Sequence, residues 1–295
     1  MTIKHAKLGL GTVQWGLKYG IANRGGRVAV DTVSDILGAA RESGIMILDT
    51  AAQYGDAEAV LGANSVAGFK VVTKTPSFRA AVISDAHARQ VAKTYDESLQ
   101  RLGLSAVYGL LAHHADDLLA PGGDKLIAAM KELKASGKVK KIGVSIYDGP
   151  QLEGLLERFT PDLVQAPISV LDQRLVLGGH LRRLVELDVE VHVRSVFLQG
   201  LLLMPLNELP VYFEPIRHVL ESWHAAAREQ RMTPTQAALS YVRDIPGVST
   251  VLVGVESLDQ LHMCMSDFSV EHCFDARDLA CDVPEFVNPA LWRLS

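Results

Sequence analysis

IMILD, at residues 45–49, is a short apolar run that ends in a carboxylate. Two later runs repeat this design: FKVVTK at residues 69–74 ends in a lysine, and VYGLLAH at residues 107–113 ends in a histidine. Short apolar runs bounded by polar residues are typical of buried strands. Because the carboxyl ends of neighbouring parallel strands meet at one edge, we expect the three polar residues to lie together.

Runs of this kind recur along the whole chain. The expected strands are residues 7–12, 45–49, 69–74, 107–113, 140–145, 162–167, 189–195 and 250–254. Between them, segments such as Val30–Gly44 and Asp85–Leu102 have apolar residues at three- and four-residue spacing, which predicts helices. Eight strand-then-helix units predict an α/β fold, a single (β/α)8 TIM barrel.

A doubly wound parallel sheet is the competing architecture. It would normally carry a glycine-rich phosphate loop directly after its first strand. The stretch GLGTVQ at residues 9–14 has neither the third glycine nor the following helix of that motif. The pattern therefore favours the barrel.

The chain is expected to form one domain that includes residues 1–295. No linker rich in proline, glycine or serine and no low-complexity tract interrupts it. Residues 200–215 are interpreted as an insertion between the seventh strand and its helix. Residues 265–295 are interpreted as a C-terminal tail that folds back over the barrel.

Charge and composition limit the classes of function. The formal net charge is −5 and the basic residues are scattered, so neither nucleic acid nor a membrane surface is an expected partner. The N-terminus lacks the apolar core of a signal peptide, and no apolar run has membrane-spanning length. These features predict a cytoplasmic protein. No heptad pattern marks an association surface, so a monomer and a weak homodimer both stay open.

A tyrosine completes the polar group at the strand ends. Tyr54 lies five residues after Asp49, in the loop that follows that strand. A phenol titrates at about pH 10 unaided, and a neighbouring ammonium such as that of Lys74 stabilises the phenolate. A carboxylate such as Asp49 keeps the ammonium charged and in place. The set suggests proton donation by a tyrosine of raised acidity.

The motifs and their order resemble those of the aldo-keto reductases. The matching stretches are GLGT at 9–12, LDTAAQYG at 48–55, TKT at 73–75, LLAH at 110–113, IGVS at 142–145 and LVQAP at 163–167. The ordered set covers nearly the whole chain and is far more specific than any one stretch. The resemblance implies an oxidoreductase on a TIM barrel that uses NADP(H) or NAD(H) to reduce a small aldehyde or ketone.

The resemblance also implies roles for the four polar residues. Tyr54 protonates the carbonyl oxygen as hydride reaches the carbon, Lys74 lowers the pKa of Tyr54, and Asp49 pairs with Lys74. His113 donates a hydrogen bond to the carbonyl oxygen. The family places its histidine directly after the apolar run, which selects His113 over its neighbour, and His114 is a further candidate for the pocket wall.

Eight positions match cofactor-binding segments of the family: Ser145, Gln165, Arg194, Ser195, Leu198, Gly254, Glu256 and Gln260. Ser145 and Gln165 are expected to hold the nicotinamide carboxamide. Arg194 replaces an aromatic residue that usually stacks on the nicotinamide, and its guanidinium plane is expected to stack instead. Glu256 lies where NADPH-preferring members carry Lys or Arg. We therefore expect NADH to be used at least as well as NADPH.

Two other functions stay open from the residues alone. The first is a metal-dependent barrel hydrolase or lyase with zinc or manganese ligands among Asp49, His113, His114 and His192. Such hydrolases usually begin with an H-x-H pair that residues 7–12 lack, so no metal is expected. The second is a dinucleotide-sensing regulatory subunit without turnover of its own.

Overall fold

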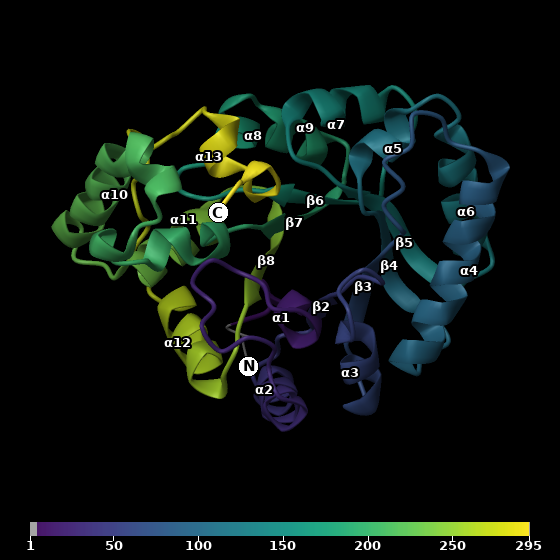
Figure 1. The fold of residues 1–295 in the computed structure, drawn as a ribbon, viewed down its shortest axis with the longest axis horizontal. Coiled ribbons are helices and arrows are strands. Elements are labelled where there is room, and N and C mark those ends of the chain that lie inside the picture. Colours follow the sequence, from purple (N-terminus) through teal and green to yellow (C-terminus); the bar gives the residue numbers. More distant parts are fainter. Residues whose placement is uncertain (1–4, 295) are drawn as a thin grey trace.

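The computed structural model describes residues 5–294. Eight parallel strands follow one another around a closed barrel, and helices surround it (Figure 1). The strands are β1 (Leu8–Gly11), β2 (Ile47–Asp49), β3 (Lys70–Lys74), β4 (Val107–Ala112), β5 (Val139–Ser145), β6 (Leu163–Pro167), β7 (Glu190–Arg194) and β8 (Val248–Gly254). The prediction of a (β/α)8 TIM barrel is confirmed, and the expected strands differ from these only at their ends.

Helices follow the strands along the chain. The α-helices are α1 (Val13–Gly16), α2 (Val30–Glu42), α3 (Ala57–Ala63), α4 (Asp85–Leu102), α5 (Ala115–Leu119), α6 (Asp124–Ala135), α7 (Gly149–Leu156), α8 (Arg174–Leu177), α9 (His180–Glu186), α10 (Arg217–Glu229), α11 (Pro234–Asp244), α12 (Leu258–Phe268) and α13 (Pro284–Val287). Short 3-10 segments are η1 (Leu198–Leu203), η2 (Leu206–Glu208), η3 (Val211–Ile216) and η4 (Pro289–Leu291).

The first and last strands close the sheet on itself. Leu10 of β1 pairs with Leu48 of β2 on one side and with Val253 of β8 on the other. All strands are parallel, so their carboxyl ends form one rim. The register between β2 and β3, in which Asp49 pairs with Val72, brings the ends of these strands to neighbouring places on that rim.

Local residues explain where the longest helix begins and ends. Ser84 and His87 form a capping box at the start of α4, in which Ser84 N donates to His87 Nδ1 at 3.1 Å. Gly103 ends the helix in the left-handed conformation, with a φ of 66°, which glycine adopts at little cost. The predicted helix at residues 85–102 is confirmed at both ends.

The barrel interior is closely packed beneath its rim. Val72 lies two residues before Lys74, so both side chains belong to the same face of β3. Val72, Leu111 and Leu163 form a buried apolar cluster. A Cβ on Gly143 would lie 1.7 Å from the Leu163 carbonyl oxygen, so only glycine allows β5 and β6 to approach there. The polar residues at the rim therefore rest on a packed apolar layer.

The predicted insertion and the first residues of the predicted tail lie in regular elements. Residues 200–215 lie within the 3-10 segments η1–η3 and their connections. The tail predicted from residue 265 begins only after α12, which continues to Phe268. Residues 1–4 and 295, which the predicted domain includes, lie outside the described residues.

The C-terminal tail, which contains α13 and η4, packs against the insertion that contains η3 (Figure 1, yellow beside green). Tyr212 Oη donates to Glu285 O at 2.8 Å. The Trp292 ring packs edge-on against Phe213, with ring centres 4.9 Å apart. Through these contacts η4 reaches the rim of the barrel, where Pro289 borders the cavity described below.

The length and the hydropathy of a helix determine whether it could span a membrane. None of the helices in the described part of the chain combines the length and the apolar composition that a membrane crossing requires.

Candidate active site

A buried ion pair lies at the rim between β2 and β3. Asp49 is the last residue of β2, and Lys74 is the last residue of β3. Lys74 Nζ donates to both carboxylate oxygens of Asp49 at 2.8 Å and to Thr50 O at 2.9 Å. The side chains are only 1% and 7% exposed for Lys74 and Asp49, respectively. Because every donor of the ammonium is used, the pair meets the condition under which buried charges are tolerated.

Gln165 extends this network across the barrel. Its Nε2 donates to Asp49 Oδ1 at 2.7 Å, and Ser145 Oγ donates to Gln165 Oε1 at 3.4 Å. The two residues expected to hold a carboxamide thus lie beside the ion pair. Both side chains are buried, Ser145 at the end of β5 and Gln165 within β6, so their positions are determined by the barrel and not by a loop.

Tyr54 lies in the loop after β2, next to the ion pair. Lys74 Nζ is 4.9 Å from the centre of the Tyr54 ring, and the His113 ring centre is 5.7 Å from it in a T-shaped arrangement. A Cβ on Gly16 would lie 1.8 Å from Tyr54 O, so glycine is required where α1 meets this loop. The structure brings the four predicted catalytic residues together.

The acidity of Tyr54 differs from the expectation. Burial raises the pKa of Tyr54 far above its usual value of 10.0, the charge of Asp49 raises it further, and Arg194 acts in the opposite direction. The ammonium of Lys74 is bound to Asp49 at 2.8 Å and lies 4.9 Å from the centre of the Tyr54 ring. Burial and Asp49 dominate this shift, and the lowering of the Tyr54 pKa by Lys74 stays a prediction. The phenol is protonated at neutral pH, which is the form that a proton donor needs.

His113 follows β4 and faces the Tyr54 ring. Burial and then the positive charges of Lys74 and Arg194 lower the pKa of His113 to about 3. Nδ1 of this imidazole has no hydrogen-bond partner among the described residues. A neutral imidazole has one donor and one acceptor nitrogen, so His113 is able to form a hydrogen bond with a ligand at any pH near neutrality.

This shift predicts that the His113 imidazole stays neutral between pH 5 and pH 8. Nuclear magnetic resonance of the ring should show titration near pH 3 and not near the usual 6.5. The unfolded chain binds this proton near pH 6.5, but the folded chain binds it only near pH 3. The free energy of unfolding should therefore fall as the pH is lowered from 6.5 toward 3. The variant His113→Asn should lack this component of the acid dependence. A ring that titrates near 6.5 in the folded protein would contradict the assignment.

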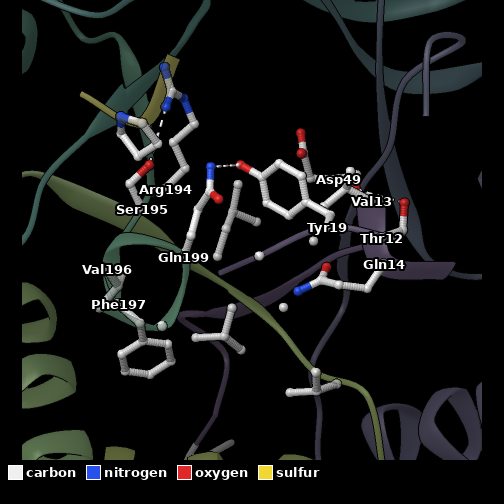
Figure 2. Close-up of a pocket in the computed structure, with 18 of the residues that line it drawn as sticks. Thr12, Val13, Gln14, Tyr19, Asp49, Arg194, Ser195, Val196, Phe197 and Gln199 are labelled. Atoms are coloured by element: carbon white, nitrogen blue, oxygen red, sulfur yellow. Dashed lines mark hydrogen bonds between the residues drawn. The ribbon is translucent and has the colours of Figure 1, made fainter. Parts of the chain in front are cut away.

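Arg194 ends β7 and borders the same pocket. Its guanidinium carbon lies 4.4 Å from the centre of the Tyr147 ring, and Nη2 donates to Ile146 O at 2.9 Å. Nη1 donates to Ser195 Oγ at 3.2 Å (Figure 2). One face of the guanidinium is therefore occupied by a neighbouring tyrosine, an arrangement that the sequence did not indicate.

The segment after β7 is tightly wound. Ser195, Leu198 and Gln199 have positive φ angles of 62°, 45° and 55°, which are costly for residues other than glycine and concentrate at ligand sites. Gln199 Nε2 donates to Tyr19 Oη at 3.1 Å, so the loop after α1 is joined to η1 across the pocket (Figure 2).

These residues border one cavity of about 500 Å³, a size typical of small-molecule and cofactor sites. The predicted site residues that line it are Asp49, Tyr54, Lys74, His113, Ser145, Gln165, Arg194, Ser195, Gly254, Glu256 and Gln260. Leu198 does not line it: its side chain is fully buried in the core, and its amide donates to Ser195 O at 2.9 Å. The cavity extends from the ion pair to the first turn of α12.

One buried acceptor in the cavity has no protein partner. Gln14 Oε1 makes no hydrogen bond within the described chain, and Figure 2 shows this amide directed into the cavity. A Cβ on Gly254 would lie 2.2 Å from Gln14 Nε2, so glycine at the end of β8 leaves the space that Gln14 uses. A buried acceptor of this kind is suited to an N–H or O–H group of a ligand, which fits a polar dinucleotide.

Gln14 and Tyr147 line the cavity without having been predicted. Gln14 lies three residues beyond β1, and Tyr147 lies two residues beyond the end of β5. Their positions in the sequence could have identified them, because residues that follow the carboxyl ends of barrel strands form the active face. His114, by contrast, is half-buried outside the cavity lining.

His192, a candidate metal ligand, lies within β7 below the rim. Its ring is fully buried, and Nε2 is 2.6 Å from Glu190 Oε1. Across residues 5–294, no three side chains of His, Cys, Asp or Glu are gathered as a metal site would require. The metal-dependent hydrolase hypothesis therefore has no ligand set in this part of the chain.

Comparisons with known proteins place the chain among oxidoreductases. A family model described as "Aldo/keto reductase family" matches residues 7–276. The NADH-specific methylglyoxal reductase of Escherichia coli (strain K12) is 24% identical, over 87% of each chain. L-galactose dehydrogenase of Arabidopsis thaliana is 29% identical, over 80% of this chain and 77% of its own. The holo form of aldo-keto reductase AKR11C1 from Bacillus halodurans has a TM-score of 0.73 at 22% identity, covering 92% of this chain and 89% of that chain.

Proposed function

The chain belongs to the aldo/keto reductase family of oxidoreductases, and we propose on this basis that it uses NADH or NADPH to reduce a small aldehyde or ketone. One observation carries the proposal. Tyr54, His113 and the pair Asp49–Lys74 border the same cavity as the polar residues after β8. A proton donor, a hydrogen-bond donor and a site for an extended polar ligand thus face one space.

Positions in the cavity suggest which residues would hold the cofactor. Ser145 and Gln165 lie next to the ion pair and would bind the nicotinamide carboxamide, while Gly254 and Gln260 lie toward α12 and would border the adenosine. The reduced nicotinamide, when bound, supplies the hydride. The orphaned acceptor of Gln14 supports a ligand with N–H or O–H groups at this place.

Tyr54 is the proposed general acid. Reduction places negative charge on the carbonyl oxygen, and a protonated phenol gives that oxygen a proton. Its raised pKa keeps Tyr54 protonated before the reaction. As the phenolate forms, the Lys74 ammonium, 4.9 Å from the ring centre, stabilises the new charge. Asp49 holds that ammonium in place, so the two residues act on the substrate through Tyr54.

His113 is proposed to orient the carbonyl group. Because its pKa is lowered to about 3, the ring is neutral and its N–H donates to the carbonyl oxygen without transferring a proton. His113 N donates to Thr75 Oγ1 at 3.3 Å, which holds the residue at the end of β4. Two donors on one oxygen fix the direction from which hydride reaches the carbon.

Turnover of a small aldehyde tests this function. The purified protein is mixed with NADH or NADPH and a panel that includes methylglyoxal, and oxidation of the cofactor is followed by its absorbance. We expect cofactor oxidation that requires the carbonyl compound and yields the alcohol. A protein that oxidises neither cofactor with any small aldehyde or ketone would contradict the proposal.

Local charge at the far end of the cavity favours NADH. Among the described cavity-lining residues, Lys74 and Arg194 are the only lysine or arginine side chains, and neither belongs to the segment after β8 that contains Glu256. Glu256 N donates to Gln260 Oε1 at 2.8 Å, which holds the residue at the start of α12. Burial raises the pKa of Glu256, and a 2′-phosphate would raise it further. Binding of NADPH therefore brings its 2′-phosphate against a negative carboxylate or requires Glu256 to take up a proton. The free 2′-hydroxyl of NADH can instead donate a hydrogen bond to this carboxylate.

Glu256→Arg is expected to shift the cofactor preference toward NADPH by about tenfold or more, because a charge-assisted hydrogen bond replaces a repulsion. Dissociation constants of both dinucleotides, measured by fluorescence titration, check the shift. Glu256→Gln is the matched control that removes the repulsion without adding a cation, and it should give an intermediate ratio. A wild-type protein that binds NADPH much more tightly than NADH would contradict the role of Glu256.

A further inference from the structure

The catalytic end of the cavity contains one cation without a counter-ion. Lys74 is neutralised by Asp49 at 2.8 Å. For Arg194, by contrast, no carboxylate lies within 4 Å of the guanidinium anywhere in residues 5–294; its recorded partners are Ile146 O, Ser195 Oγ and the Tyr147 ring. All three partners are uncharged. A half-buried cation without an anion is a costly arrangement, and a ligand anion would remove that cost.

The guanidinium is held ready for such a ligand. Stacking on Tyr147 at 4.4 Å and the bond to Ile146 O at 2.9 Å fix its plane. Two of its five N–H groups are accounted for by protein acceptors. The remaining donors keep the fork geometry that matches the two oxygens of a carboxylate. Because the plane is fixed in advance, little entropy is lost on binding.

The position of Arg194 identifies the reacting end of the ligand. Arg194 pairs with Pro167 at the end of β6, and Gln165, two residues earlier on that strand, donates to Asp49. The charge of Arg194 also acts on both Tyr54 and His113. An anion bound to Arg194 would therefore lie on the side of the cavity where Tyr54 and His113 meet the carbonyl group.

We propose that Arg194 binds a carboxylate of the substrate, so that the preferred substrates are oxo acids: aldehydes or ketones that carry a carboxylate a few bonds from the carbonyl. The inference rests on the proposed reductase function and names the substrate class of the same site. The carboxylate fixes one end of the substrate, while Tyr54 and His113 fix the carbonyl oxygen at the other. A second source of anion is the pyrophosphate of the cofactor, and the experiment separates the two.

The test compares two aldehydes of equal carbon number, succinic semialdehyde and butanal, which differ in the carboxylate. We expect the wild-type protein to turn over succinic semialdehyde with a kcat/KM about tenfold or more above that for butanal, the effect of one charge-assisted hydrogen bond. Arg194→Gln should bring this ratio close to one, and Arg194→Lys should restore part of it. Arg182→Gln is the matched control, because Arg182 is 82% exposed on α9 and outside the cavity; its ratio should equal that of the wild type.

The dissociation constant for NADH is measured on the same variants. If Arg194→Gln weakens NADH binding by the same factor by which it lowers turnover of both aldehydes, the arginine binds the cofactor, and the inference is overturned. Turnover of both aldehydes by the wild type without preference for the anion also overturns it and leaves the reductase function standing. Absence of turnover with both these aldehydes and the neutral panel overturns the two proposals together. If Arg194→Gln does not fold, Arg194→Lys is compared with the wild type in its place, and a wild-type ratio near one overturns the inference without any variant.

Discussion

Tyr54→Phe should lower kcat by a factor of about 10² to 10⁴, the usual contribution of general acid catalysis. The substitution removes one oxygen and keeps the ring, so the contacts with Lys74 at 4.9 Å and with His113 at 5.7 Å remain. The proton donor is lost, but the cofactor cavity is not altered in shape. Steady-state cofactor oxidation with methylglyoxal measures the effect, and a fluorescence titration should give a similar dissociation constant for NADH.

Tyr212→Phe is the matched control for this change. Tyr212 also loses a hydroxyl that donates a hydrogen bond, to Glu285 O at 2.8 Å, but it lies outside the cavity lining. Its turnover should match that of the wild type. A Tyr54→Phe protein that retains full turnover would remove Tyr54 from the mechanism. Loss of turnover with NADH binding retained would also separate an enzyme from a protein that only senses the dinucleotide.

Lys74→Met is expected to lower the free energy of unfolding by about 3–5 kcal/mol, the usual cost of removing one partner of a buried ion pair. Asp49 would keep only the bond from Gln165 at 2.7 Å in a place where its side chain is 7% exposed. Turnover should also fall, because the charge that forms on Tyr54 loses its nearest cation. Denaturant unfolding measures the stability change, and steady-state kinetics measures the loss of turnover.

The double variant Asp49→Asn, Lys74→Met separates the two effects. Without the carboxylate no buried charge is left unpaired, so part of the stability should return. Turnover should stay low, since the ammonium is still absent. A Lys74→Met protein as stable as the wild type would show that the ion pair does not support the fold as described.

Much of the architecture could be predicted because the barrel has a simple sequence pattern. Each strand is a short apolar run, and polar residues follow at the carboxyl end, as Asp49 and Lys74 do. Parallel closure then requires these ends to meet at one rim. The juxtaposition of Tyr54 with Lys74 followed from that rule together with the short loop after β2.

Other features depend on contacts that no local pattern encodes. The stack of Arg194 on Tyr147 joins residues from β7 and from the loop after β5, and a sequence does not reveal which face of a guanidinium is covered. The raised pKa of Tyr54 arises from burial and from Asp49, and both require the three-dimensional arrangement. The motif predicts a cofactor contact for Leu198, but the tight turn with its positive φ directs this side chain into the core.

Isotope labelling of the cofactor shows whether hydride passes from the nicotinamide to the carbonyl carbon in this cavity. NADH that carries deuterium at both positions of its hydride-donating carbon is mixed with the protein and methylglyoxal, and the reduced product is analysed by mass spectrometry. We expect one deuterium on the former carbonyl carbon and a solvent-derived proton on the oxygen. A reduced product without carbon-bound deuterium, or no reduced product at all, would contradict hydride transfer in this cavity.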